Sequence, residues 1–376
     1  MPVSDPHENA LAALAAKGRL RALSPSAGRD FTSNDFLALA DSVALRDAAT
    51  AELARGVPLG AGGSRLLRGN HPEHEALEEE AAAFFGSETA LFFPTGFAAN
   101  AAIAATLPRR GDLIVYDELI HASFRDGLEP SRVQAAQAPH NDVPAMDTII
   151  TGWRDGGGKG RVWIAVETLY SMDGDFAPLS DLVGLAQRHE AILILDEAHA
   201  TGVYGDQGRG LGAAYEGAPN IISLHTCGKA LGAAGALVCL PRLYRDFLVN
   251  RGRAFIYSTA PSPLMAAVVR AALKICAGAE QERIQLRMLV RHAQELMHKL
   301  GLPTSGSQIQ PVVVGEDRRA VMLAQALQAK GHDVRAIRPP TVPEGTARLR
   351  IALTLHVTCN DLDSLFADLA AEMAKA

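Results

Sequence analysis

The stretch Ala191-Ile192-Leu193-Ile194-Leu195-Asp196 is a continuous apolar run that ends in an acid. A run of this kind is typical of a parallel strand that is buried on both faces. In α/β proteins, polar site residues gather at the carboxyl ends of such strands. Further along the chain, Lys229 lies in a turn of small residues, Thr226-Cys227-Gly228-Lys229-Ala230. The acid and the lysine together indicate a site at the end of a parallel sheet.

This pair has the chemistry that a pyridoxal phosphate (PLP) site requires. An acid beside the pyridine nitrogen keeps the ring protonated, so that the ring can take up electrons, and a lysine holds the aldehyde as a Schiff base. Either residue alone would mean little, because a lone lysine is usually a solvated surface charge and many strands end in Asp. We therefore interpret Asp196 and Lys229 together as the centre of a cofactor site.

Further apolar runs, separated by helical patterns, predict the rest of a large α/β domain. Strands are expected at residues 91–93, 113–116, 162–166, 192–195 and 235–239. Helical stretches such as 73–85 lie between them. Near-continuous apolar strands that alternate with helices predict a mostly parallel sheet covered on both faces.

The pattern changes past about residue 272. A long helix is expected at 281–300, a shorter one at 320–330, and strands at 310–314 and 347–353. This pattern predicts a smaller C-terminal α+β domain. At the other end, residues 11–23 are rich in Ala and Leu with interspersed basic residues, which predicts a short helix. The expected division is an N-terminal segment at 1–45, a large domain at 46–271 and a small domain at 272–376.

Composition excludes several classes of protein. The chain has 376 residues, of which 48% are hydrophobic, and this is enough for a large core. A net charge of −6 shows no sign of a nucleic-acid footprint. The cysteines are scattered without metal-binding spacing, which favours a reducing compartment and no metal. No run approaches the roughly 20 apolar residues of a membrane span, and the first residues lack a secretory pattern. We expect a soluble, cytoplasmic protein.

Other residues become candidates beside Asp196 and Lys229. The sequence Phe93-Pro94-Thr95-Gly96-Phe97 predicts a strand, a turn and a helix start whose amides can bind a phosphate, although an ordinary turn would look the same. His121 follows a strand and could stack on a cofactor ring, or simply be a hydrogen-bonded loop residue. His199 leaves the same strand end as Asp196 and could reach the cofactor's phenolic oxygen.

Arg348 and Arg350 alternate with apolar residues in the last expected strand. Arg binds a carboxylate through two hydrogen bonds, which suits an amino-acid substrate. A half-exposed strand with solvated charges is the alternative.

These motifs add up to a family resemblance that covers nearly the whole chain. The chain resembles the α-oxoamine synthases, which are fold-type I PLP enzymes. The resemblance runs from about Leu11 to the end of the chain. Its motifs are Asn34-Asp35-Phe36-Leu37, Gly60-Ala61-Gly62-Gly63-Ser64, Glu73-His74-Glu75-Ala76-Leu77-Glu78, Thr95-Gly96-Phe97-Ala98-Ala99-Asn100, His121-Ala122-Ser123, Ser171-Met172-Asp173-Gly174-Asp175, Asp196-Glu197-Ala198-His199 and Gly228-Lys229.

The resemblance implies a homodimer with active sites at the interface, and it assigns roles to individual residues. Lys229 carries the Schiff base, Asp196 pairs with the pyridinium, His199 meets the phenolic oxygen and His121 stacks on the ring. Further cofactor contacts are implied for residues that match the family's motifs, namely Gly96, Phe97, Ser171 and Thr226, with Ser258 and Thr259 reaching the partner's phosphate. Substrate contacts are implied for Arg21, Asn34, His121, Thr341 and Arg350, of which Asn34 and Arg350 hold the carboxylate.

Within the family, the segment from Ala336 to Pro343 and the following Gly345 to Arg350 most resemble the members that condense L-alanine with pimeloyl-CoA, or pimeloyl on an acyl carrier protein, in biotin biosynthesis. The alternatives are the members that use other amino acids and acyl chains: 5-aminolevulinate synthase, glycine C-acetyltransferase and serine palmitoyltransferase. A non-catalytic partner subunit is disfavoured because Lys229, Asp196 and His199 are all present. A Rossmann oxidoreductase is disfavoured because no GxGxxG follows an early strand.

Overall fold

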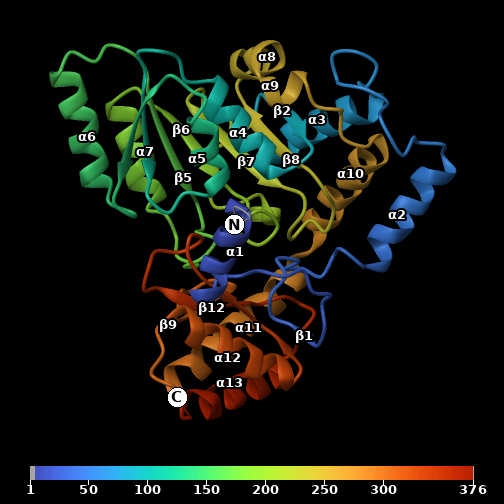
Figure 1. The fold of residues 1–376 in the computed structure, drawn as a ribbon. Helices are drawn as coiled ribbons and strands as arrows, with labels where there is room; N and C mark the ends of the chain where they lie inside the picture. Colours follow the sequence, from blue (N-terminus) through green and yellow to red (C-terminus); the bar gives the residue numbers. More distant parts are fainter. Residues whose placement is uncertain (1–4, 376) are drawn as a thin grey trace. The chain divides into compact units, whose positions relative to one another are not determined.

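The computed structural model describes residues 5–375 and consists of two compact units (Figure 1). The large unit comprises Leu37–Ser171 and Phe176–Arg283, and the small unit comprises Met1–Phe36, Met172–Asp175 and Ile284–Ala376. The division into three domains by sequence stays a prediction.

The large unit is built on a seven-stranded sheet with the strand order β2-β8-β7-β6-β5-β3-β4. Only β8 runs antiparallel to its neighbours, so that the sheet is mostly parallel, as predicted. The strands, in spatial order, are β2 (Thr89–Phe93), β8 (Ala236–Leu240), β7 (Ile221–Thr226), β6 (Ile192–Asp196), β5 (Val162–Glu167), β3 (Leu113–Asp117) and β4 (Gln134–Ala138).

Side chains of these strands alternate between two apolar layers. In β6, Ile192 and Ile194 belong to one buried cluster, while Leu193 and Leu195 belong to another on the opposite face. Successive side chains of a strand point to opposite faces of the sheet. The central strands β5 and β6 are apolar at every position before their terminal acids because helices cover both faces, which confirms the predicted α/β class.

Helices lie on both faces of the sheet (Figure 1). The helices of the large unit are α2 (Val43–Ala54), α3 (Pro72–Phe85), α4 (Gly96–Thr106), α5 (Ala122–Leu128), α6 (Val143–Asp155), α7 (Leu179–Arg188), the short η1 (Asp206–Gly208), α8 (Arg242–Arg251), α9 (Arg253–Ile256) and α10 (Pro263–Gly278). Of these, α2 and η1 pack on α10. The next helix, α11 (Glu280–Lys299), crosses from the large unit into the small one.

The small unit is α+β, as the sequence predicts. Strands β11, β12 and β9 form an antiparallel sheet in that order, and β1 pairs with β10 in parallel. Its elements are α1 (Pro6–Ala16), β1 (Arg29–Asp30), β9 (Ile309–Gly315), α12 (Asp317–Ala329), β10 (His332–Asp333), β11 (Arg335–Ile337), β12 (Ala347–Ala352) and α13 (Cys359–Met373).

The N-terminal helix differs from the sequence prediction. We expected a helix at 11–23, but α1 spans Pro6–Ala16, so the prediction is wrong for residues 17–23. Gly18 follows the C-cap with a φ of 68°. Glycine adopts this left-handed conformation without steric cost and commonly ends a helix.

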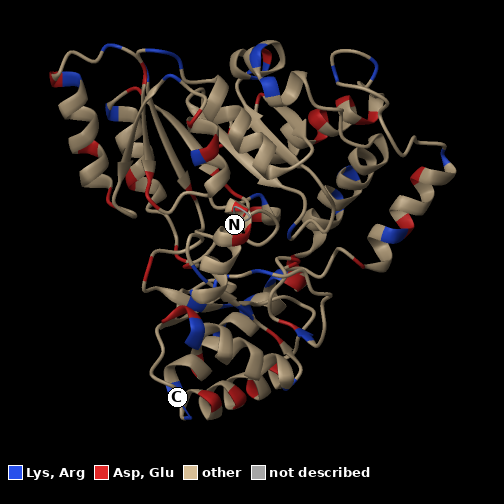
Figure 2. Cartoon of the chain, viewed as in Figure 1, with Lys and Arg blue, Asp and Glu red and all other residues tan. Residues whose placement is uncertain are grey.

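Charged residues of both signs are interspersed on the two units (Figure 2). Among residues 5–375, no helix has the length and apolar character that crossing a membrane requires.

Candidate active site

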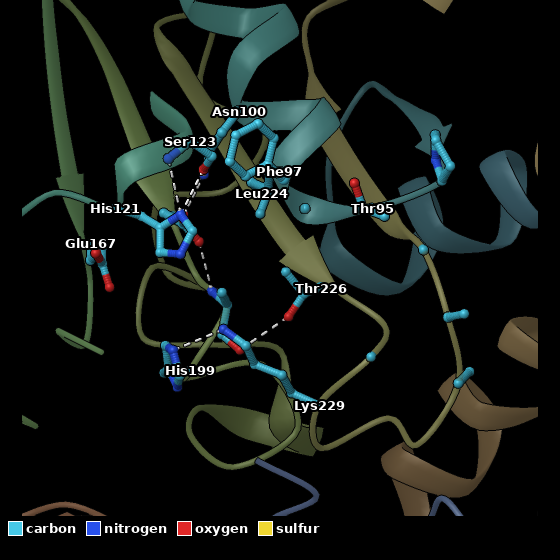
Figure 3. Close-up of a pocket in the computed structure, with 18 residues that line it drawn as sticks. Thr95, Phe97, Asn100, His121, Ser123, Glu167, His199, Leu224, Thr226 and Lys229 are labelled. Atoms are coloured by element: carbon cyan, nitrogen blue, oxygen red, sulfur yellow. Dashed lines mark hydrogen bonds between the residues drawn. The ribbon is translucent and has the colours of Figure 1, made fainter. Parts of the chain in front are cut away.

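A cavity of about 350 Å³ opens in the large unit, where β5, β6 and β7 end and α4 begins (Figure 3). Parallel strands end at one edge of the sheet, so residues far apart in the sequence meet there. The polar side chains that line the cavity are Thr95, Asn100, His121, Ser123, Glu167, Asp196, His199, Thr226 and Lys229. The structure therefore brings together Asp196, Lys229, His199 and His121, the four residues expected to act on the cofactor.

Asp196 is fixed at the end of β6 by two neutral donors. Its Oδ2 accepts a hydrogen bond from Nδ2 of Asn100 at 2.7 Å, and its Oδ1 accepts one from the backbone N–H of Ala198 at 3.0 Å. Only 6% of Asp196 is exposed. These contacts orient the carboxylate without neutralising it, so a cation that enters the cavity would be strongly attracted.

Lys229 lies in the loop between β7 and β8, with its Nζ 2.8 Å from Nε2 of His199 (Figure 3). The loop is closed by backbone hydrogen bonds from Cys227 to Gly235 and from Ala233 to Cys227, both at 2.9 Å. This closed loop presents the amine to the cavity from a fixed backbone.

The start of α4 forms one wall of the cavity. Thr95 caps the helix by accepting a hydrogen bond from the N–H of Ala98 at 3.0 Å, and the N-terminal amides of Gly96 and Phe97 lie at the cavity. Such amides, together with the helix dipole, favour a phosphate. A Cβ built on Gly96 would lie 2.7 Å from Cγ2 of Thr226, so a larger residue would disturb this wall.

His121 is the N-cap of α5, and its ring projects at the cavity (Figure 3). Its Nδ1 is 2.7 Å from Oγ of Ser123. The pKa of His121 is lowered, chiefly because the ring is partly removed from water, while the charge of Asp196 acts in the opposite direction. The ring is therefore expected to be neutral near pH 7, as suits an imidazole that stacks on a flat cofactor.

Sequence reasoning gave no role to several cavity residues, among them Asn100, Ser123 and Glu167. Asn100 was part of a quoted motif but received no role, although it holds Asp196. Glu167 ends β5 directly beside Asp196 in the sheet register and is 2% exposed. Its Oε2 accepts a hydrogen bond from the N–H of Ser171 at 3.0 Å. The available signal was that Glu167, like Asp196, is an acid at the end of a buried apolar strand.

Several expected contacts do not line this cavity. Ser171 holds Glu167 through its backbone, and neither Ser171, Ser258 nor Thr259 is part of the lining. The roles of Ser258 and Thr259 toward a partner subunit stay predictions.

The expected substrate residues pair with one another in the small unit. Nη2 of Arg350 donates to Oδ1 of Asn34 at 2.9 Å, and Nη2 of Arg21 donates to Oγ1 of Thr341 at 3.2 Å. Each pair joins the N-terminal segment to the C-terminal part of the unit. The other candidate arginine, Arg348, forms an ion pair with Asp173.

Comparison with known proteins identifies the family. The sequence model of the family described as aminotransferase class I and II matches residues 28–368. The chain belongs to this family. A relative from Chromobacterium violaceum named 8-amino-7-oxononanoate synthase is 43% identical over 342 residues, which are 89% of this chain and 86% of the relative. One of the same name from Geobacter sulfurreducens is 41% identical over 344 residues, 90% of this chain and 87% of the relative.

Solved structures agree. A serine palmitoyltransferase from Sphingomonas wittichii superposes with a TM-score of 0.89 at 25% identity, over 99% of this chain and 97% of that one. An 8-amino-7-oxononanoate synthase from Francisella tularensis superposes with a TM-score of 0.79 at 27% identity, over 93% of this chain and 98% of that one. These findings confirm the predicted fold type I, the recognition of an α-oxoamine synthase, and the prediction of a PLP-dependent acyltransferase.

The residues present fit PLP. Asp196 offers a buried carboxyl group that accepts hydrogen bonds from neutral donors, Lys229 offers an amine, and the start of α4 offers amides for a phosphate. The wall at Gly96 leaves no room for a Cβ. These three features match the ring nitrogen, aldehyde and phosphate of one cofactor.

Gly96→Ala provides a test of this wall. Because the new methyl group would overlap Cγ2 of Thr226, we expect the free energy of unfolding to fall by about 1–3 kcal/mol. The double variant Gly96→Ala/Thr226→Ser removes Cγ2 and keeps the hydroxyl that donates to the carbonyl of Ala198, so it should recover most of the loss. Chemical denaturation of both variants measures the effect, and equal losses in the single and double variants would contradict the proposed packing.

Proposed function

We propose that this chain condenses L-alanine with a pimeloyl thioester, carried by CoA or by an acyl carrier protein, to give 8-amino-7-oxononanoate, CO₂ and the free carrier in biotin biosynthesis. The observation that carries the proposal is the cavity that joins Asp196, Lys229 and His199 in a chain more than 40% identical to proteins named 8-amino-7-oxononanoate synthase. We propose a homodimer in the cytoplasm as the working form.

When bound, PLP supplies a cationic ring that withdraws electrons from the substrate's α-carbon. Asp196 would hold the ring nitrogen in its protonated form, because its buried carboxylate favours a cation. His121 would lie against the face of the ring, and the start of α4 would hold the phosphate. His199, 2.8 Å from Lys229, would position the amine and the phenolic oxygen.

Lys229 is the proposed proton carrier. Once its amine is free, Nζ can take the proton from the α-carbon of alanine, as a general base must lie within hydrogen-bonding reach of the proton that it removes. Arg350, oriented by Asn34, would bind the carboxylate that is later lost as CO₂. Arg21 and Thr341 would contact the acyl substrate.

The second candidate is condensation of another amino acid, and the resemblance to serine palmitoyltransferase structures supports it. The identity of 25% to that enzyme is lower than the 43% to the first relative, and we therefore favour alanine and pimeloyl.

A product assay tests the choice of substrate. Purified protein is offered alanine, glycine or serine, each with pimeloyl-CoA or palmitoyl-CoA, and products are identified by mass. We expect kcat/KM for alanine with pimeloyl-CoA to exceed that of every other pair by roughly 100-fold or more, since a pocket built for one substrate discriminates by a few kcal/mol. Comparable or faster turnover of serine with palmitoyl-CoA would overturn the assignment.

Lys229→Ala tests the proposed lysine. Turnover should fall by roughly a thousandfold or more, because both the cofactor link and the proton carrier are lost. Borohydride reduction followed by peptide mapping should fix PLP to residue 229 in the wild type and to no lysine in the variant. Lys274→Ala, whose side chain is 71% exposed on α10, is the matched control and should behave as the wild type. Fixation of PLP to another lysine in the wild type would refute the role of Lys229.

A further inference from the structure

Three neighbouring strands of the large sheet each end in a buried carboxyl group. They are Asp117 of β3, Glu167 of β5 and Asp196 of β6, which are 0%, 2% and 6% exposed. Glu167 is the register partner of Asp196. Side chains two positions apart in a strand point to the same face of the sheet. Glu167 and Asp196 therefore lie on the same face as Trp163 and Ile194, which is the face of the cavity. Asp117 lies on the opposite face, with Leu113 and Val115.

Asp117 is well compensated. Its Oδ1 accepts a hydrogen bond from the N–H of Leu119 at 2.8 Å and its Oδ2 accepts one from the N–H of Asn141 at 2.7 Å. Nδ1 of His140 lies 2.9 Å from Oδ1. These contacts can support a negative charge in the absence of water.

Glu167 is the least compensated of the three. Its Oε2 accepts one hydrogen bond, from Ser171, whereas its Oε1 is buried and has no hydrogen-bond partner among residues 5–375. Asp196, its neighbour, has a donor for each oxygen. Of two adjacent buried carboxyl groups, the one with fewer donors holds a proton more readily.

Burial and the two neighbouring acids favour the neutral form of Glu167, whereas Lys229 opposes it. Burial, followed by the charge of Asp196, raises the pKa of Glu167 to about 8. Asp117 adds to this effect, while Lys229 and the N–H of Ser171 oppose it. The neutral form is therefore favoured at neutral pH as long as the charge of Asp196 is not offset.

We infer that Glu167 is a positioning residue that acts through Asp196: it holds a proton while Asp196 faces no cation, and it releases that proton to solvent when the cationic ring of the cofactor pairs with Asp196. This inference rests on the proposed PLP site. Pairing with a cation removes the repulsion by Asp196, which after burial is the second cause of the raised pKa of Glu167. Ionised Glu167 then adds a second negative charge near the ring nitrogen.

The sign of the pH dependence follows from linkage. A binding step that releases a proton becomes tighter as pH rises, by up to tenfold per pH unit. The effect ends above about pH 8, where Glu167 has already lost its proton in the cofactor-free protein. Glu167→Gln is permanently neutral, so its Kd for PLP should equal that of the wild type at low pH and exceed it increasingly as pH rises toward 8.

The experiment is equilibrium dialysis of the holoenzyme at a series of pH values between 6 and 9, for the wild type and Glu167→Gln. The ratio of their Kd values cancels the titration of PLP itself. We expect the ratio to change roughly tenfold per unit below pH 8 and to level off above it. Pyridoxine 5′-phosphate has the same ring and no aldehyde, so Lys229 keeps its amine with this ligand. The ratio of Kd values should be the same as with PLP, because the pH dependence comes from the ring and not from the link to Lys229.

Glu197→Gln is the matched control. Glu197 is also fully buried, but it lies outside the cavity lining, and its oxygens accept hydrogen bonds from Thr168 at 2.9 Å, Leu211 at 3.0 Å and Gly212 at 2.5 Å. The ratio of the Kd for PLP of Glu197→Gln to that of the wild type should not change with pH.

A ratio for Glu167→Gln that is constant with pH would overturn the inference while leaving the PLP site intact. Absence of PLP binding in the wild type would instead refute the proposed function. If Glu167→Gln does not fold, infrared difference spectra of the wild type with isotope-labelled glutamate decide the question. Loading PLP at pH 7 should remove the carbonyl stretch of a protonated glutamate, and an unchanged band would refute the inference.

Discussion

The buried carboxylate of Asp196 is the interaction on which the site depends. An ionised group away from water is costly unless an opposite charge and hydrogen bonds compensate it. In this chain the hydrogen bonds come from Asn100 and Ala198, both neutral, and Lys229 is bonded to His199. The protein thus fixes a buried carboxyl group at the cavity through neutral donors, with Lys229 as the amine that lines the same cavity. This arrangement favours a cofactor that is cationic where it meets the strand end.

The fold places this acid at the end of β6 without weakening the packing of the sheet. The sheet is held by apolar side chains on both faces, so its strands can end in acids without losing their packing. Parallel neighbours place those ends at one edge. Helix α4 then contributes two different functions from one element: the amides at its start face the cavity, and one turn later Asn100 holds the carboxylate. A single strand-turn-helix unit would therefore serve both ends of the cofactor in the proposed site.

Local motifs were enough to predict the acid and the adjacent histidine, because both lie at the end of β6, whose apolar run is visible in the sequence. The lysine was predicted from its turn of small residues, Thr226-Cys227-Gly228-Lys229-Ala230. The strands β4 and β7 were missed, since Gln134–Ala138 has no β-branched residue and Ile221–Thr226 contains Ser and His. The partners of Asp196 could not be predicted, because the contact with Asn100 joins residues 96 positions apart. Glu167 was missed for a related reason. Its effect arises from Asp196, its neighbour in the sheet, and the order of strands in a sheet cannot be read from the spacing of motifs along the chain.

The most direct measurement is the ¹⁵N chemical shift of the ring nitrogen in holoenzyme prepared with ¹⁵N-labelled PLP, compared between the wild type and Asp196→Asn. Asn keeps the size of the side chain and removes its charge. We expect the wild-type nitrogen to stay protonated from neutral pH into the alkaline range, and the nitrogen in the variant to be unprotonated near neutral pH. The same shift with the same pH dependence in both proteins would contradict the role of the Asp196 charge.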